Sequence, residues 1–414
     1  MEMTYLARQP ILGKTGEILG YEILYRDPDS LGTLREDSVI TSSVVSSIVN
    51  IFGIEHIIGQ YLGFIKVNLA FLQDALFASL PRERFVFSLF DRELEQPKEL
   101  NILVDLVKKG YRFAINDTAL TRLPEDEKLL NAIDYIKIDS LTLAPDDCRH
   151  LVEQCRKHGI EIIASKVETH EAYDAFYDLG ADYFQGYYLR KPKLFENATI
   201  KASEAAILNL WNLIQEDAAT DAIVDAFEAH HALSIQLLRF INSAFFSMRR
   251  EITSIRHLIV LLGRRQLLQW LMLLLASQKA SEHKNSHPLL LMVVNRTEIM
   301  TGLQQLLRPE SSRADRESAY LVGMLSLIHL LFHMQHREIL THLNVSQEIE
   351  EAMFEAECAL GELLVMTRYI ESNDIEAINR FVSDNRLDPK KVNALIVEAM
   401  KKVNLFDEAI SSLV

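Results

Sequence analysis

Tyr135-Ile136-Lys137-Ile138-Asp139 and Glu161-Ile162-Ile163-Ala164-Ser165 are two short apolar runs, and a helical pattern over residues 146–158 separates them. β-Branched and aromatic residues dominate both runs, as they do in strands that are buried on both faces. A strand, a crossover helix and a second strand make the unit from which mostly parallel sheets are built. The pattern recurs across residues 5–192. Roughly eight strands in about 190 residues predict a compact, TIM-like (β/α) barrel.

Polar residues lie within the predicted strands or directly after them. They are Glu22, Asn68, Asn116, Asp117, Lys137, Asp139, Glu168 and Gln185. Because the carboxyl ends of barrel strands meet at one mouth, we expect these side chains to share a pocket. The alternative is that each of them satisfies a separate buried neighbour.

The second half of the chain has a different pattern. From about residue 201 the strand-like runs vanish, and apolar residues recur with the helical period. Helices are predicted over residues 202–215, 220–230, 234–242, 255–262, 265–279, 347–369, 374–381 and 389–403. We therefore predict an α/β domain over residues 1–198 and an all-helical domain over residues 199–414.

Charge and cysteine usage exclude several classes of protein. The formal net charge of -15 argues against nonspecific binding to nucleic acid or to an anionic membrane. The three cysteines, Cys148, Cys155 and Cys358, have neither a disulfide pattern nor a zinc spacing, which is typical of the reducing cytoplasm. The most apolar stretch, residues 258–276, contains two adjacent arginines, so we expect a buried helix of a soluble protein.

An ordered set of motifs in residues 5–195 resembles the EAL domain, a barrel that in its active form hydrolyses the bacterial second messenger cyclic di-GMP with two divalent metals. The motifs are Arg8-Gln9-Pro10-Ile11, Glu22-Ile23-Leu24-Tyr25-Arg26, Asn68, Lys137-Ile138-Asp139, and Gln185-Gly186-Tyr187 with Pro192. The resemblance implies that Arg26 binds phosphate. It implies further candidate ligand contacts at Gln9, Asp139, Gln185 and Pro192.

The chain departs from the EAL pattern at three acidic positions. The family has glutamate where Ser88 stands, Asp-Asp where Asn116-Asp117 stands, and Ala-Glu-Gly-Val-Glu where Ala164-Ser165-Lys166-Val167-Glu168 stands. Three acidic ligands are therefore replaced by Ser88, Asn116 and Ser165, and a glycine is replaced by Lys166. The vestigial site that the resemblance implies consists of Glu22, Asn68, Ser88, Asn116, Asp117, Lys137, Ser165 and Glu168.

These replacements predict that the barrel neither holds metal nor acts as an enzyme. Magnesium and manganese bind hard oxygen ligands, and a two-metal site needs carboxylate charge to hold its cations about 4 Å apart. We expect no cofactor. Lys137 is expected to pair with a remaining carboxylate, and Gln185 to be needed by the packing of the barrel. The alternative is that Gln9, Arg26 and Gln185 still bind cyclic di-GMP without hydrolysis.

The helical half resembles the HDOD domain, a relative of the metal-dependent HD phosphohydrolases that lacks their His-Asp dyad. The best match is residues 233–244, followed by Met292-Val293-Val294-Asn295-Arg296 and Gly323-Met324-Leu325-Ser326-Leu327. An active HD protein would carry its dyad near Ser326. His329, His333 and His336 share a helix face, with His342 beyond them, and two readings are a zinc site and a polar helix face. We favour the polar face, because this spacing specifies a metal site poorly.

EAL followed by HDOD is an arrangement of bacterial signalling proteins. The resemblance implies a noncatalytic protein that binds a protein partner in cyclic di-GMP-linked control of motility, biofilm or virulence. A cyclic di-GMP receptor is the alternative, and an active phosphodiesterase is the third reading. A homodimer through residues 118–127, where EAL barrels often pair, is a further hypothesis.

Overall fold

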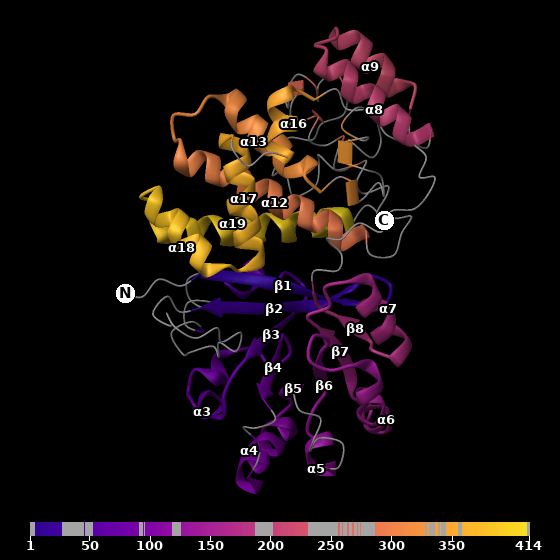
Figure 1. Ribbon diagram of the computed structural model, residues 1–414, viewed down its shortest axis with the longest axis vertical. Coiled ribbons are helices and arrows are strands. Elements are labelled where there is room, and N and C mark those ends of the chain that lie inside the picture. The colour runs from indigo at the N-terminus through magenta and orange to yellow at the C-terminus, as the bar shows by residue number, and fades with distance from the viewer. Residues whose placement is uncertain are drawn as a thin grey trace. The chain divides into compact units, whose positions relative to one another are not determined.

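The computed structural model describes residues 5–26, 53–90, 96–117, 126–186, 202–230, 286–327, 345–354 and 358–411, with shorter pieces between them. The chain forms two compact units, Met1–Lys191 and Pro192–Val414. Figure 1 shows strands surrounded by helices in the first unit and helices in the second. The predicted domain boundary at residue 198 lies in 187–201, outside the described residues.

The first unit is a closed barrel of eight strands (Figure 1). β1 is antiparallel to both of its neighbours, β2 and β8, and all other neighbouring strands are parallel. This confirms the predicted TIM-like barrel. The strands are β1 (Tyr5–Gly13), β2 (Ile18–Arg26), β3 (Leu62–Lys66), β4 (Phe85–Phe90), β5 (Arg112–Asp117), β6 (Tyr135–Asp139), β7 (Glu161–Ser165) and β8 (Tyr183–Phe184).

Helices connect the parallel strands and begin and end at recognisable caps. α4 (Pro97–Lys108) starts with a capping box between Gln96 and Glu99, which satisfies backbone N–H groups at the first turn. α7 (His170–Leu179) is capped by Thr169 and ends at Gly180, whose φ of 109° needs glycine. Shorter connections are α2 (Ile54–Ile58), α3 (Leu69–Leu72), η2 (Phe77–Ser79) and α5 (Glu127–Leu130).

One barrel helix differs from its predicted form. The pattern over residues 146–158 predicted a single α-helix, but the segment starts as the 3₁₀ turn η5 (Pro145–Cys148) and continues as α6 (Arg149–His158). Pro145 is pre-set for a first helical turn, and tight 3₁₀ turns are common at helix starts. Gly159 ends α6 in the left-handed conformation.

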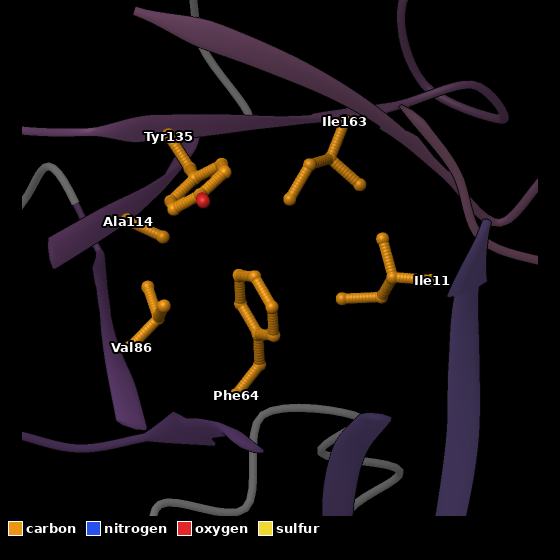
Figure 2. Packing of buried hydrophobic residues seen from close by; sticks show 6 residues of the cluster. All are labelled: Ile11, Phe64, Val86, Ala114, Tyr135 and Ile163. Atoms are coloured by element: carbon orange, nitrogen blue, oxygen red, sulfur yellow. The ribbon is translucent and has the colours of Figure 1, made fainter. Parts of the chain in front are cut away.

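The interior of the barrel is filled by one apolar side chain from each of six strands. Figure 2 shows these side chains converging: Ile11, Phe64, Val86, Ala114, Tyr135 and Ile163. All six are buried. Since side chains alternate between the two faces of a strand, residues two positions away also face the interior. The residues two positions before or after this layer on each strand therefore line the rest of the barrel interior.

The second unit consists of helices. They are α8 (Ala202–Gln215), α9 (Thr220–Glu228), α12 (Ser286–Leu307), α13 (Arg313–Leu325), α16 (Gln347–Phe354), α17 (Ala359–Ser372), α18 (Ile375–Asp384) and α19 (Pro389–Ser411). α12 packs against α13, α17 and α19. Gly323 allows the close contact with α13, because a Cβ there would lie 2.8 Å from Thr297 Cα. Trp211 of α8 is completely buried, as expected for a core residue.

Two predicted helices differ from the observed ones. Residues 347–369 were expected to be one helix but form α16 and α17, because Cys358 is extended (φ −94°, ψ 157°) and caps a new helix through Gly361 N–H. α19 runs on to Ser411 instead of residue 403, since its apolar face continues through the buried Phe406. The helices predicted over 234–242, 255–262 and 265–279 lie outside the continuously described segments.

Across the described segments, no helix combines the length and the apolar character that crossing a bilayer requires. Cys148, Cys155 and Cys358 are free thiols.

Candidate functional site

A layer of polar side chains lies above the apolar layer of the barrel. Two residues beyond Phe64, Val86, Ala114, Tyr135 and Ile163 come Lys66, Ser88, Asn116, Lys137 and Ser165. On β1, which runs in the opposite direction, the corresponding residue is Gln9, two positions before Ile11. The period of two therefore brings these side chains to the carboxyl-terminal side of the apolar layer. Of the residues that the sequence analysis expected to share a pocket, Asn116 and Lys137 belong to this layer.

Glu22 is the centre of this polar layer. It lies opposite Gln9 on β1 and Phe64 on β3, and it is 4% exposed. Lys137 Nζ donates to Glu22 Oε1 at 2.7 Å, and Gln185 Nε2 donates to Glu22 Oε2. Burial by itself would raise the pKa of Glu22, but the charges of Lys137 and Lys66 outweigh burial and hold this pKa at about 2. The negative charge of Glu22 is therefore compensated by lysines of the same chain.

Gln185 connects the last strand of the barrel with the first. Its Nε2 also donates to Gln9 Oε1 at 2.9 Å, so the two candidate ligand contacts bond to each other. Gly186 follows, and a Cβ at this position would lie 2.0 Å from Val167 O. Only glycine fits against the segment after β7. Packing and hydrogen bonding therefore account for Gln185 and Gly186, the part of the closing motif that the structure describes.

A second ion pair lies at the end of β6. Asp139 is 8% exposed, and its Oδ1 accepts a hydrogen bond from Leu141 N–H. Asp139 Oδ2 lies 3.1 Å from Lys166 Nζ. Lys166 has a left-handed backbone with φ 56°, which costs a non-glycine residue about 1–2 kcal/mol. The chain therefore places a strained lysine beside one of its remaining carboxylates.

Three residues stand where the EAL resemblance implies acidic ligands, and their surroundings differ. Ser165 Oγ donates to Ile138 O at 3.0 Å and is satisfied. Ser88 is completely buried and Asn116 is 8% exposed, and within the described part of the chain neither Ser88 Oγ nor Asn116 Nδ2 has a hydrogen-bond partner. A buried polar group without a partner costs about 1–3 kcal/mol. These two groups are therefore energetically unfavourable in this state of the barrel.

Two other predicted site residues, Asn68 and Glu168, are exposed. Asn68 caps α3, where its Oδ1 accepts from Phe71 N–H at 2.8 Å. The side chains of Arg26 and Asp117 and all of Pro192 lie outside what the structure describes, as do residues 118–125 of the predicted dimer contact.

Lys66 is the residue of the layer that sequence reasoning missed. Its Nζ lies 3.9 Å from Glu22 Oε1, and its side chain is 18% exposed. The available signal was its position: Lys66 stands two residues before Asn68 and interrupts an otherwise apolar strand. A charged residue inside a buried run is uncommon unless it is paired.

The helical unit has a buried polar cluster of its own. Arg296 on α12 binds Glu371 on α17 through both carboxylate oxygens, with Nε to Oε1 at 2.9 Å. Both side chains are 4% exposed. Arg296 Nη1 also donates to Ser326 Oγ at 3.1 Å, and Ser326 Oγ donates to Gly323 O. This cluster joins α12, α17 and the end of α13.

Two of the predicted histidines meet beside this cluster. The rings of His329 and His336 stack with centroids 4.4 Å apart. His336 Nε2 lies 2.9 Å from Leu325 O, and His329 Nδ1 is buried without a hydrogen-bond partner. His333 and His342 lie outside the described residues.

Comparison with known domain families assigns both halves. The sequence model of the EAL domain matches residues 68–192, and that of the HDOD domain matches residues 205–366. The chain is an EAL–HDOD protein. The motifs at Gln9, Glu22 and Arg26 precede the matched part of the EAL domain.

Two relatives match both domains. The uncharacterized protein YuxH of Bacillus subtilis is 27% identical over 408 residues, which are 96% of this chain and 97% of that protein. CdgJ of Vibrio cholerae, described as a cyclic di-GMP phosphodiesterase, is 25% identical over 407 residues, 97% of this chain and 92% of that protein. A solved structure of the PaMucR phosphodiesterase in complex with c-di-GMP is 21% identical and covers 45% of this chain and 94% of its own, with a TM-score of 0.37.

The described side chains of the EAL domain do not fit a two-cation centre. Both oxygens of Glu22 accept hydrogen bonds from the chain, and Asp139 is engaged by Lys166 and Leu141. A divalent cation prefers several oxygen ligands with negative charge. Lys137 Nζ and Asn116 Nδ2 are donors and offer a cation no lone pair.

Matched alanine substitutions test the two serines of the EAL domain. Ser88→Ala removes an unsatisfied buried hydroxyl, so we expect the free energy of unfolding to stay unchanged or to rise by up to about 1 kcal/mol. Ser165→Ala removes a satisfied hydroxyl and is expected to lower it by about 0.5–1.5 kcal/mol. Denaturant unfolding measures both. A larger loss for Ser88→Ala than for Ser165→Ala would contradict the burial and bonding described for these hydroxyls.

Acidification is expected to destabilise the HDOD domain through His329. Burial lowers the pKa of His329 to about 4, and His336, Arg296 and Arg368 add to this effect. The unfolded chain, with an ordinary histidine pKa of about 6.5, therefore binds the proton more readily. Stability is complete above about pH 6.5 and falls as the pH approaches 4, by up to about 2 kcal/mol at pH 5. Unfolding followed by tryptophan fluorescence at pH 7.5 and 5 measures the loss, and His329→Asn should reduce it.

Proposed function

We propose that this EAL–HDOD protein is a noncatalytic signalling protein that acts by binding a protein partner in cyclic di-GMP-linked regulation. One observation carries the proposal: the two buried carboxylates of the barrel site, Glu22 and Asp139, are each paired with a lysine of the chain. Lys137 lies 2.7 Å from Glu22 and Lys166 lies 3.1 Å from Asp139. The chain itself therefore supplies positive charge to these two carboxylates, which supports a role without exchangeable metal ions.

The charge at the site supports this reading. Two divalent cations about 4 Å apart repel each other, and acidic ligands must compensate that repulsion. Ser88, Asn116 and Ser165 carry no charge, and the ammonium groups of Lys66, Lys137 and Lys166 add repulsion. Without the pair of cations, no water is activated between them. The side chains are therefore suited to holding the barrel together and not to attacking a phosphodiester.

A turnover assay tests the loss of catalysis. Cyclic di-GMP is incubated with the purified full-length protein and Mg²⁺ or Mn²⁺, and the linear dinucleotide is separated by chromatography. CdgJ of Vibrio cholerae serves as the positive control, because it is described as a phosphodiesterase. We expect no product above the blank. Product formed at ordinary enzyme rates, on the order of 1 per second or faster, would overturn the proposal.

Genetic complementation tests the role of the protein itself. If the chain acts through a partner, a deletion strain with altered motility or biofilm should be restored by wild-type protein and equally by Glu168→Gln. Glu168 is one of the acidic residues that the EAL resemblance assigns to the site. Its side chain is exposed, so this change should not disturb folding. Failure of Glu168→Gln to restore the phenotype, at equal protein level, would count against a noncatalytic role. Affinity capture with the tagged full-length chain then isolates the partner.

A cyclic di-GMP receptor is the second candidate function. It is favoured by the unpartnered buried atoms Ser88 Oγ, Asn116 Nδ2 and Gln185 Oε1, because a ligand can complete such groups. Calorimetric titration with cyclic di-GMP, with and without Mg²⁺, separates the two candidates. Saturable binding without turnover favours the receptor, and absence of binding favours the protein-binding role alone.

A further inference from the structure

The HDOD domain holds a buried carboxylate beside a histidine. Asp407 on α19 has a side chain that is 3% exposed, and His287 Nε2 lies 2.7 Å from its Oδ1. His287 belongs to α12, which packs against α19. A carboxylate removed from water is costly unless a partner satisfies it, and His287 is such a partner. The pair therefore joins two helices at residues that are 120 positions apart in the chain.

This hydrogen bond fixes where the hydrogen and the lone pair of the His287 ring lie. An ionised carboxylate only accepts hydrogen bonds, so Nε2 carries the hydrogen that it donates to Asp407. In the neutral ring the lone pair then lies on Nδ1, which is a base and a nucleophile. Within the described segments no hydrogen bond involves His287 Nδ1, and the side chain is 34% exposed. A reagent in solution therefore has access to a ring whose lone pair a buried acid keeps in place.

A second histidine shows what Asp407 adds. His287 is the second residue of α12, and His150 is the second residue of α6. A negative group is stabilised in the first turn of a helix, so both positions suit a phosphorylated side chain. His150 is exposed, and no carboxylate of the described chain bonds to its ring. The feature that distinguishes His287 is therefore Asp407 and not the start of a helix.

We propose that His287 Nδ1 is a phosphorylation site whose donor is a phosphoramidate, a compound that carries its phosphoryl group on nitrogen. The Nδ1 lone pair attacks phosphorus, the P–N bond of the donor breaks, and the protonated nitrogen of the donor leaves as a neutral amine with the electron pair of that bond. The His287 ring keeps its hydrogen on Nε2 and becomes positively charged. Asp407 stabilises this charge, as a buried carboxylate stabilises an imidazolium that forms beside it. The site lies in the HDOD domain, so the inference does not depend on the function proposed for the barrel.

Incubation of the full-length protein with potassium phosphoramidate tests the site. We expect His287 to gain phosphate about tenfold faster than His150, because the buried carboxylate favours the charge that develops on the ring. Tandem mass spectrometry follows the two residues within the same molecule. Phosphorus NMR distinguishes the Nδ1 isomer from the Nε2 isomer, and the signal that disappears in His287→Gln belongs to this site. We expect the Nδ1 isomer there, since Asp407 occupies Nε2.

Asp407→Asn tests the positioning role of the acid. It should slow phosphorylation of His287 about tenfold or more and admit the Nε2 isomer, because an amide also donates hydrogen bonds and no longer fixes the tautomer. The matched control is Glu408→Gln, since Glu408 is the next residue of α19 and is exposed. This control should leave the rate unchanged. The rate at His150 serves as the internal reference, and thermal unfolding verifies that both variants are folded.

Equal rates at His287 and His150 in the wild type would overturn the inference and would show that the pair only joins α12 to α19. Phosphate on His287 Nε2 would overturn it as well, as would a rate that Asp407→Asn leaves unchanged. The comparison of the two histidines and the identity of the isomer need no variant of Asp407. Both readouts therefore decide the question if Asp407→Asn does not fold.

Discussion

Glu371→Gln is expected to lower the free energy of unfolding of the HDOD domain by about 3–5 kcal/mol. Arg296 is 4% exposed, and its described partners are Glu371 and Ser326. Glutamine keeps the shape of the side chain but removes its negative charge, which leaves a guanidinium cation buried without compensation. Breaking a buried ion pair by removing one partner costs about this much.

Tryptophan fluorescence is a suitable signal for this measurement. Both tryptophans, Trp211 and Trp270, lie in the second half of the chain. The matched control is Glu362→Gln on the same helix, since Glu362 is exposed and acts on the helix dipole alone, at about 0.3–1 kcal/mol. The double variant Arg296→Met, Glu371→Leu should recover much of the loss, because an apolar pair of similar volume often replaces a buried ion pair without penalty. Equal losses for Glu371→Gln and Glu362→Gln would show that the pair does not stabilise the domain.

Lys137→Met is expected to lower the stability of the barrel by about 3 kcal/mol. It leaves the carboxylate of Glu22, which is 4% exposed, with Gln185 and the more distant Lys66. Burial raises the pKa of Glu22, and the charge of Lys137 is the main cause that lowers it to about 2. This pKa should therefore rise in the variant. A carboxyl whose folded pKa is depressed contributes its full stability above its unfolded pKa and loses this contribution as the pH falls through the folded pKa. The stability that Glu22 gives the wild-type barrel is therefore lost between about pH 4.5 and about pH 2. The variant should lose this acid dependence.

Hydrogen exchange followed by mass spectrometry reports the barrel separately from the helical unit. Peptides covering β6 and β2 should lose protection in Lys137→Met and keep it in Lys108→Met, whose lysine is exposed. Adding Glu22→Gln to Lys137→Met should restore part of the protection, since the uncompensated charge is then gone. A double variant less stable than Lys137→Met would contradict the view that the uncompensated charge of Glu22 causes the loss of stability.

The predicted fold depended on features that are local in sequence. Strands such as Tyr135–Asp139 were predictable because buried parallel strands are continuous apolar runs, and α7 was predictable because Thr169 and Gly180 mark its ends. The division into α16 and α17 was not, since it depends on the extended conformation of one residue, Cys358. A helical period continues across such a break and conceals it.

The sequence predicted the residues and contacts of the candidate site only in part. The polar residues after the strands could be read as one group because a barrel brings strand ends together. Asn68 and Glu168 were expected to join them but are exposed. Lys66 was missed because a single lysine in an apolar run has no motif of its own.

The amino-acid sequence by itself determined the barrel and the helical second half, because both follow from the hydrophobic period of the chain. Only the tertiary structure decided which charges neutralise one another: Lys137 with Glu22, Lys166 with Asp139 and Arg296 with Glu371. Lys137 and Glu22, and Arg296 and Glu371, are far apart in the chain. Lys166 and Asp139 are closer in sequence, and each lies at the end of one of two neighbouring strands. Pairing of charges depends on distance and burial in the folded protein, and neither quantity is written in the order of the residues.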